Sequence, residues 1–189
     1  MKIFIVRHGE TIENQKRICQ GQMHGSLSEK GILQARQTGE YLKNERFGHC
    51  YCSDLQRAKD FCSYITAFHK NLITTYDKRL RERYFGSFQG MPFPADMKCF
   101  QPPSDTELIE DFYNRAYHFY HDITNCGNEN LLVISHGVTI RALIAIAQQK
   151  TAGAIDSVDE IKNGALTVIE TYQGITPTII LLNSTKHLQ

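Results

Sequence analysis

Two short apolar runs in this chain end in the same way, each with a histidine and a glycine. Residues 3–6 (IFIV) lead into Arg7-His8-Gly9, and residues 131–134 (LLVI) lead into Ser135-His136-Gly137. A run of four large apolar residues that stops near a glycine is typical of a strand buried on both faces. Ligands of parallel α/β sheets bind at the carboxyl ends of the strands. If the two strands are neighbours, both imidazoles therefore face one pocket.

Strand and helix signals alternate along the rest of the chain. Ser28 is a candidate N-cap, and Ser53 with Gln56 and Ser104 with Glu107 have the spacing of capping boxes. Alternation of this kind predicts a single α/β domain over 1–189, with three α/β/α layers and helices on both faces of a mostly parallel sheet. We expect strands at 3–6, 49–52, 72–76, 131–135, 165–172 and 177–183, and helices at 28–44, 53–69, 104–124 and 138–149. Residues 10–27 and 79–103 are predicted to be irregular.

Composition narrows the functional classes. The chain has 189 residues, a net charge of +1 and 41% hydrophobic residues, so bulk charge favours neither nucleic acid nor membrane as a partner. No apolar run reaches the roughly 20 residues that a membrane span needs. Met1-Lys2 leads straight into the first strand, which leaves no room for a signal peptide. We therefore expect a cytoplasmic protein.

The six cysteines contain no Cys-x-x-Cys pair, and reduced thiols are expected in a cytoplasmic protein. Cys50 and Cys52 alternate on a predicted strand, so both side chains point to one face. Two ligands do not complete a zinc site, and core packing is the better interpretation.

Charged residues near the strand ends suggest phosphoryl-transfer chemistry. A phosphoryl group in transfer carries negative charge on its oxygens and needs clustered cations and hydrogen-bond donors. Arg7 precedes His8, and Arg57 lies early in the helix after Ser53. The planar fork of arginine matches two phosphate oxygens at once. Glu82 follows the third predicted strand and could transfer a proton. A neutral imidazole can attack phosphorus when one ring nitrogen donates and the other is free.

The ordered landmarks of the chain resemble those of the histidine phosphatase superfamily, the phosphoglycerate-mutase-like proteins. A lone Arg-His-Gly triplet would be weak, but the resemblance extends from residue 3 to about residue 143. It rests on Arg7-His8-Gly9-Glu10-Thr11, Asn14, Gln20-Gly21, Leu27-Ser28, Gly31, Gln34-Ala35, Ser53, Leu55, Arg57-Ala58, Leu80-Arg81-Glu82, Phe85-Gly86, Gly90 and Ser135-His136-Gly137.

The resemblance implies a role for each site residue. His8 would carry the phosphoryl group as a phosphohistidine, and Glu82 would protonate the leaving oxygen and then deprotonate the attacking water. The phosphate oxygens would be held by Arg7, Arg57 and His136, with further substrate contacts from Asn14, Gln20, Gly21 and Gly137. Neither a metal nor another cofactor is implied, because these cations and His136 supply the positive charge.

Each assignment has a plainer alternative. Arg57 could be an exposed helix residue, and Glu82 could form a weak surface pair with Arg81 or Arg83. Glu10 could be a second pocket carboxylate or a solvated loop charge. The aromatic residues of 112–120 have the spacing of core positions rather than of a substrate box. His24, Ser26, Asp60 and Phe61 depart from the family pattern and leave the substrate rim open, His24 either as a rim donor or as a structural loop residue.

Hydrolysis is the favoured reaction. The interval between Glu82 and His136 is short for this superfamily, and the only obvious cover is residues 91–106, which carry no dense basic cluster for a second phosphate. A mutase must exclude water from its intermediate, which requires an enclosing lid. We therefore expect a phosphatase acting on a small phosphorylated metabolite. A mutase, a non-catalytic phospho-ligand binding protein and a metal-dependent hydrolase are the alternatives. The oligomeric state stays open, with a homodimer as one option.

Overall fold

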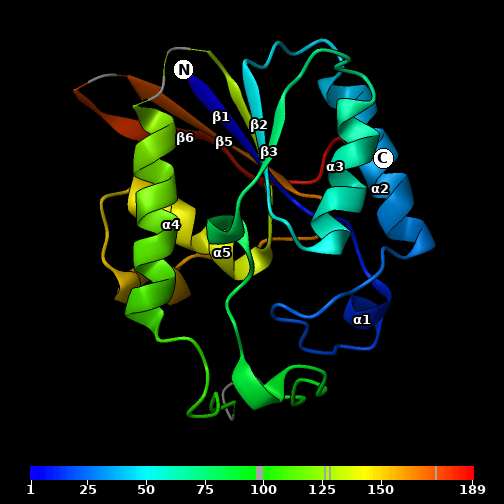
Figure 1. Ribbon diagram of the computed structural model, residues 1–189, viewed down its shortest axis with the longest axis vertical. Coiled ribbons are helices and arrows are strands. Elements are labelled where there is room, and N and C mark those ends of the chain that lie inside the picture. The colour runs from blue at the N-terminus through cyan, green and yellow to red at the C-terminus, as the bar shows by residue number, and fades with distance from the viewer. Residues whose placement is uncertain (97–99, 126, 128, 173) are drawn as a thin grey trace.

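The computed structural model describes residues 1–96, 100–125, 127, 129–172 and 174–189. In these residues strands and helices alternate along most of the chain (Figure 1). The strands are β1 (Lys2–Arg7), β2 (His49–Cys52), β3 (Thr74–Tyr76), β4 (Leu131–Ser135), β5 (Leu166–Tyr172) and β6 (Ile175–Ser184). The α-helices are α1 (Ile12–Gln15), α2 (Glu29–Leu42), α3 (Gln56–Thr66), α4 (Ile109–Thr124) and α5 (Gly137–Ala147), and the short 3-10 helices are η1 (Lys78–Leu80), η2 (Gly86–Phe88) and η4 (Ala152–Ser157).

The strands form a mixed sheet in which the two histidine-terminated strands are neighbours. Over the described part of the chain the strand order is β3-β2-β4-β1-β5-β6. β1 pairs with β4 in parallel, with Arg7 opposite Ser135, and the amide of His8 donates to the carbonyl of Ser135 at 3.0 Å. β2 and β3 continue the parallel part, whereas β5 and β6 are antiparallel. The two apolar runs are therefore neighbours, which is the condition under which both histidines face one pocket.

Helices cover both faces of the sheet, as predicted (Figure 1). Successive side chains of a strand point to opposite faces. Ile3 and Ile5 of β1 belong to one core cluster with α4 and α5, and Phe4 and Val6 belong to another with α2 and α3. The central strands are buried on both faces, which explains their continuous apolar sequences. Of the aromatic residues of α4, Phe112, Phe119 and Tyr120 are buried as the core interpretation predicts, whereas Tyr117 is exposed.

Two predicted helix caps are wrong. Ser28 does cap α2, by accepting from the amide of Gly31 at 3.1 Å. Ser53, however, does not cap a helix, because α3 begins at Gln56 and the Ser53 hydroxyl contacts the imidazole of His136. Ser104 and Glu107 likewise precede α4, which begins at Ile109, and the Glu107 carboxylate pairs with Arg115 instead. In both cases a tertiary partner occupies the side chain that the local pattern assigns to a cap.

The cysteines that the structure describes are free, buried thiols. They are Cys19, Cys50, Cys52 and Cys62, whereas Cys99 and Cys126 lie outside the described residues. Cys50 and Cys52 both belong to the core cluster under α2 and α3, as their alternation predicts. None of the helices found in the described residues has the length and apolar character needed to cross a membrane.

Candidate active site

His8 lies at the carboxyl end of β1 and is 3% exposed. Its Nδ1 contacts the carbonyl oxygen of Gly9 at 2.7 Å. A carbonyl only accepts, so Nδ1 carries the proton and the Nε2 lone pair is free. Arg57 Nε donates toward Nε2 at 3.3 Å. Burial, and then the charges of Arg57 and Arg7, lower the pKa of His8 well below its ordinary value of 6.5. The ring is therefore a neutral imidazole, in the protonation state that a nucleophile needs.

His136 lies behind His8, at the end of β4. The two ring centroids are 5.1 Å apart, and His136 is fully buried. The Ser53 hydroxyl accepts from the amide of Leu55 at 3.3 Å and lies 2.7 Å from His136 Nε2, to which its O–H can donate. With Nε2 accepting, Nδ1 carries the proton, and it has no hydrogen-bond partner among the described residues. Burial is the main cause that lowers the pKa of His136, and the positive charges of Arg57 and Arg7 lower it further. His136 thus offers one buried neutral N–H donor.

Two arginines surround these imidazoles. Arg57, in the first turn of α3, is 1% exposed, and it donates from Nη1 to Met23 O at 2.8 Å and from Nη2 to Gly21 O at 2.7 Å. Burial lowers its pKa to about 10, so it remains a cation at neutral pH. Arg7 donates to the carbonyl of Ile161, and its buried Nε is unpaired within the described residues. Unpaired buried donors beside cations favour an anionic ligand.

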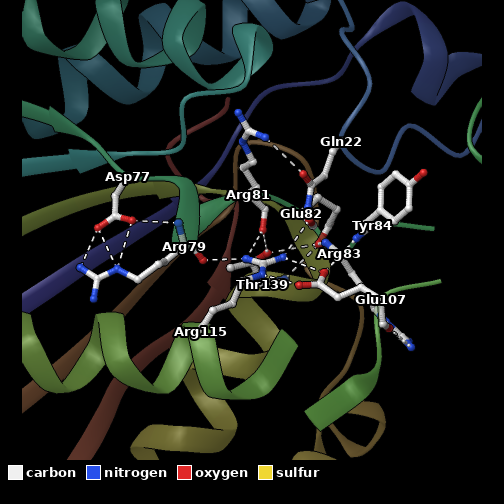
Figure 2. A network of polar contacts seen from close by, with 10 residues as sticks. All are labelled: Gln22, Asp77, Arg79, Arg81, Glu82, Arg83, Tyr84, Glu107, Arg115 and Thr139. Atoms are coloured by element: carbon white, nitrogen blue, oxygen red, sulfur yellow. Dashed lines mark hydrogen bonds and ion pairs between the residues drawn. The ribbon is translucent and has the colours of Figure 1, made fainter. Parts of the chain in front are cut away.

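Glu82 lies in the segment between η1 and η2, and its carboxylate points at the N-terminus of α5 (Figure 2 shows its contact with Thr139). Oε2 accepts from the amide of Val138 at 3.1 Å, and Oε1 accepts from the amide of Thr139 at 3.2 Å. Oε1 also accepts from the amide of Arg83 at 3.0 Å. The alternative interpretation, a surface ion pair of Glu82 with Arg81 or Arg83, does not hold, because Arg81 pairs with Asp54 and the Arg83 guanidinium donates to Glu107 O.

A single cavity of about 400 Å³ brings most of the predicted residues together. Those that line it are Arg7, His8, Asn14, Gln20, Gly21, Arg57, Glu82 and Gly137. His136 is the exception, because it lies beneath the cavity surface against His8. Glu10 pairs with Lys30 at 3.2 Å and is not among the lining residues, and neither is the exposed His24.

Three of the predicted binding residues also support the site from within. The carbonyl of Gly21 anchors Arg57, and the Gln20 amide donates to Thr11 Oγ1 at 2.9 Å. Asn14 Oδ1 accepts from Asn163 Nδ2 at 3.1 Å. Asn163 also donates to the carbonyls of His8 and Gly9, each at 3.3 Å, so it ties the loop before β5 to the end of β1. No local pattern marks Asn163 in the sequence, and the prediction missed it.

Apolar side chains form a further part of the cavity lining, an apolar wall that the sequence did not reveal. It consists of Ile18, Phe85, Phe93, Val138 and Ile161. Phe93 reaches it because residues 17–19 and 91–93 run alongside each other, with the amide of Phe93 donating to Arg17 O at 2.8 Å. Arg17, Arg141 and Glu160 also line the cavity, and Arg141 is paired with Asp156 at 3.0 Å. The cavity lining therefore combines the cationic residues beside His8 with an apolar wall.

Backbone contact between two glycines sets the loop that follows β1. A Cβ on Gly9 would lie 2.5 Å from the carbonyl oxygen of Gly31 at the start of α2. Real Cβ atoms do not approach a backbone oxygen so closely, so only glycine fits here. This contact explains why the chain turns directly after His8, and it places the carbonyl of Gly9 against His8 Nδ1.

Within the described residues no group of three or more His, Cys, Asp or Glu side chains is arranged to hold a metal ion. His8, Glu82 and His136 therefore do not form a ligand set there. The arrangement can hold a tetrahedral anion between a neutral imidazole and a carboxyl group.

Comparison with known proteins gives concordant matches. The model of the histidine phosphatase superfamily (branch 1) matches residues 3–185. Phosphoglycerate mutase-like protein 4 of Arabidopsis thaliana is 30% identical over 100% of this chain and 87% of its own length. The broad-specificity phosphatase YOR283W of Saccharomyces cerevisiae is 30% identical over 76% of this chain and 69% of its own. The structure of Bacillus stearothermophilus YhfR has a TM-score of 0.88 at 24% identity, covering 100% of this chain and 99% of that one, which shows a shared fold.

Proposed function

This chain belongs to the histidine phosphatase superfamily and is a phosphohydrolase of small phosphoesters, and from that premise we propose that it works through a phosphohistidine on His8. One observation carries the proposal. His8 Nδ1 is fixed as a donor to Gly9 O, so Nε2 keeps its lone pair beside the Arg57 guanidinium. This tautomer in a cationic environment is what in-line attack on a phosphate ester requires.

In the first step His8 Nε2 attacks phosphorus. A P–N bond forms, the P–O bond to the leaving group breaks, and Glu82 transfers its proton to the leaving oxygen. Arg7, Arg57 and the Nδ1–H of His136 stabilise the negative charge on the phosphoryl oxygens. For this step Glu82 must hold a proton, and its place in the same cavity as His8 supports the role.

In the second step water attacks the phosphohistidine. Glu82, now a carboxylate, takes a proton from that water, the P–N bond breaks, and inorganic phosphate leaves. The amides of Val138 and Thr139, which hold the Glu82 carboxylate, stabilise its charged form at this stage. One residue thus serves as acid and then as base, and His8 returns to its original tautomer.

The apolar wall of the cavity supports hydrolysis rather than a mutase reaction. A mutase of bisphosphorylated intermediates needs a second cluster of phosphate ligands. The wall formed by Ile18, Phe85, Phe93, Val138 and Ile161 is apolar. Of the two further arginines in the lining, Arg141 pairs with Asp156 and Arg17 donates to Pro94 O. A cavity of about 400 Å³ suits one small monoester. A small phosphorylated metabolite with an apolar part is the substrate that fits best.

Phosphate release tests this function directly. We would measure it from 4-nitrophenyl phosphate and a panel of metabolite phosphates with a metal chelator present, for the wild type, His8→Ala and His118→Ala. His118 lies exposed on α4 and serves as the matched control. Turnover that is lost only in His8→Ala, and that vanadate inhibits competitively as a mimic of the transition state, is the expected result.

Other outcomes have equally definite meanings. Activity that survives in His8→Ala contradicts the nucleophile, and activity that the chelator abolishes points to a metal-dependent hydrolase. Transfer of phosphate within a substrate without its release favours a mutase. Binding of phosphate esters without turnover indicates a phospho-ligand binding protein.

A further inference from the structure

Arg115, on α4, satisfies all of its side-chain donors within one network (Figure 2). An arginine side chain carries five N–H donors. Nε donates to Glu107 Oε1 at 2.7 Å, and Nη2 donates to Glu107 Oε2 and to Glu82 O, both at 3.0 Å. Nη1 donates to Arg79 O at 2.7 Å and to Arg81 O at 2.8 Å. Arg115 therefore binds one carboxylate and three backbone carbonyls of a single segment.

That segment, residues 79–84, is held by contacts from several elements, and Arg115 makes three of them to its backbone. It lies between β3 and η2, and in the described residues it belongs to no strand of the sheet. Several of its carbonyls accept from side chains, including Leu80 O from Ser135 Oγ at 2.8 Å and Arg81 O from Thr139 Oγ1 at 2.8 Å, and the amides of Leu80 and Arg81 donate to the backbone. Glu107 holds the far end, accepting from the amide of Tyr84 at 3.0 Å. Arg115 and Glu107 thus replace the hydrogen bonds that a sheet would provide.

The segment carries Glu82, whose carboxylate must meet both the α5 N-terminus and the substrate. The carbonyls bound by Arg115 include those of Arg81 and of Glu82 itself. The guanidinium therefore fixes the position of the Glu82 backbone, to which the catalytic side chain is attached. Arg115 is absent from the cavity lining and touches neither His8 nor the phosphate end. Its hydrogen bonds reach the site through the backbone of Glu82.

We propose that Arg115, oriented by Glu107, is a positioning residue that holds Glu82 at the distance from the leaving oxygen that proton transfer requires. This inference rests on the proposed function, in which Glu82 is the acid and base. A displacement of about 1 Å at a catalytic group can reduce its contribution a hundredfold. Loss of Arg115 removes the donor of the Arg79 carbonyl and one of the two donors of the Arg81 and Glu82 carbonyls, which keep Thr139 Oγ1 and Gln22 Nε2. The backbone at Glu82 is then held less firmly.

The test uses two substrates of the same shape with different leaving groups, 4-nitrophenyl phosphate and phenyl phosphate. Nitrophenolate is the more stable anion and leaves with little help from an acid, whereas phenolate needs the proton. A misplaced acid therefore lowers kcat/KM for phenyl phosphate more than for 4-nitrophenyl phosphate. A purely structural defect lowers both by the same factor, because it only reduces the number of active molecules.

The first variant is Arg115→Met, which keeps an unbranched apolar stem and removes the hydrogen-bond donors. The second is Glu82→Gln, the reference for a lost acid. Arg79→Met is the matched control. It removes an arginine from the same segment whose side chain pairs with Asp77 and Asp122, and it leaves the carbonyl that Arg115 binds. We expect Arg115→Met to lower kcat/KM for phenyl phosphate at least about tenfold more than for 4-nitrophenyl phosphate, within the range that general acids contribute. The ratio for Arg79→Met stays that of the wild type.

Equal losses for both substrates in a folded Arg115→Met, together with a selective loss in Glu82→Gln, overturn this inference and leave the proposed function intact. Equal losses in Glu82→Gln contradict its role as the acid, and this inference then fails with it. If Arg115→Met does not fold, Glu107→Gln provides the test, because it removes the charge that orients Arg115. A selective loss of phenyl phosphate activity in that variant supports the inference, and an unchanged ratio overturns it.

Discussion

His8 and His136 extend from adjacent parallel strands with their ring centroids 5.1 Å apart and an angle of 62° between the ring planes. In each ring one nitrogen has a hydrogen-bond partner that fixes the tautomer. These contacts are His8 Nδ1 with Gly9 O and His136 Nε2 with Ser53 Oγ. The remaining nitrogens differ in kind, since His8 Nε2 carries a lone pair and His136 Nδ1 carries a proton. In the proposed mechanism these two neutral imidazoles serve as the nucleophile and as a hydrogen-bond donor.

Ser53→Ala is expected to reduce kcat/KM about tenfold with little change in the fold. Without the hydroxyl, His136 Nε2 loses its donor at 2.7 Å, and the tautomer that places the proton on Nδ1 is no longer favoured. Steady-state kinetics with 4-nitrophenyl phosphate measure the effect. Ser63→Ala, at an exposed position on α3 where the hydroxyl donates to Asp60 O, is the control. Full activity in Ser53→Ala would contradict the role of this hydrogen bond.

The stability of the protein should fall as the pH drops below 6.5. Burial lowers the pKa of His136 well below the value of 6.5 that it has when unfolded, so below that pH the unfolded chain binds a proton that the folded chain does not. The free energy of unfolding of the wild type should therefore decrease by about 1 kcal/mol more between pH 6.5 and 5.5 than that of His136→Gln. Urea denaturation at both pH values measures this. In His118→Gln, at an exposed site, the decrease should equal that of the wild type.

Gly9→Ala is expected to destabilise the protein by about 2 kcal/mol, in the range of overpacking in close contacts. The added methyl group would lie 2.5 Å from Gly31 O, and neither backbone can move without displacing the loop after β1. Denaturant titration gives the change in the free energy of unfolding. Gly153→Ala is the control, because its Cβ would meet nothing within 4 Å. Equal stability of the two variants would show that the contact is not tight.

Phe93→Ala should raise the KM for 1-naphthyl phosphate about fivefold and leave the KM for methyl phosphate nearly unchanged. Phe93 belongs to the apolar wall, and a naphthyl group would bury apolar area against it that a methyl group cannot reach. Phe68→Ala, at a position 45% exposed after α3, is the control. A parallel rise in KM for both esters would place Phe93 in general packing rather than in leaving-group binding.

The strand-end histidines were predictable because the signal is local. A continuous apolar run followed by His-Gly identifies both the strand and its end, and the parallel pairing of β1 with β4 follows the usual arrangement of such sheets. Arg57 and Glu82 followed from the ordered landmarks of the chain. The capping boxes failed because they too are local patterns, but Ser53 and Glu107 have tertiary partners in His136 and Arg115.

The sequence by itself determined which segments become buried strands and amphipathic helices, and which strand ends carry the histidines, because periodicity and composition act over a few neighbouring residues. Only the tertiary structure decided how the site is held. Ser53 meets His136 across 83 positions, and Asn163 meets His8 across 155. Contacts of this kind depend on how elements distant in the chain are packed together. The position of a side chain in space, rather than its neighbours in sequence, therefore selects its hydrogen-bond partner.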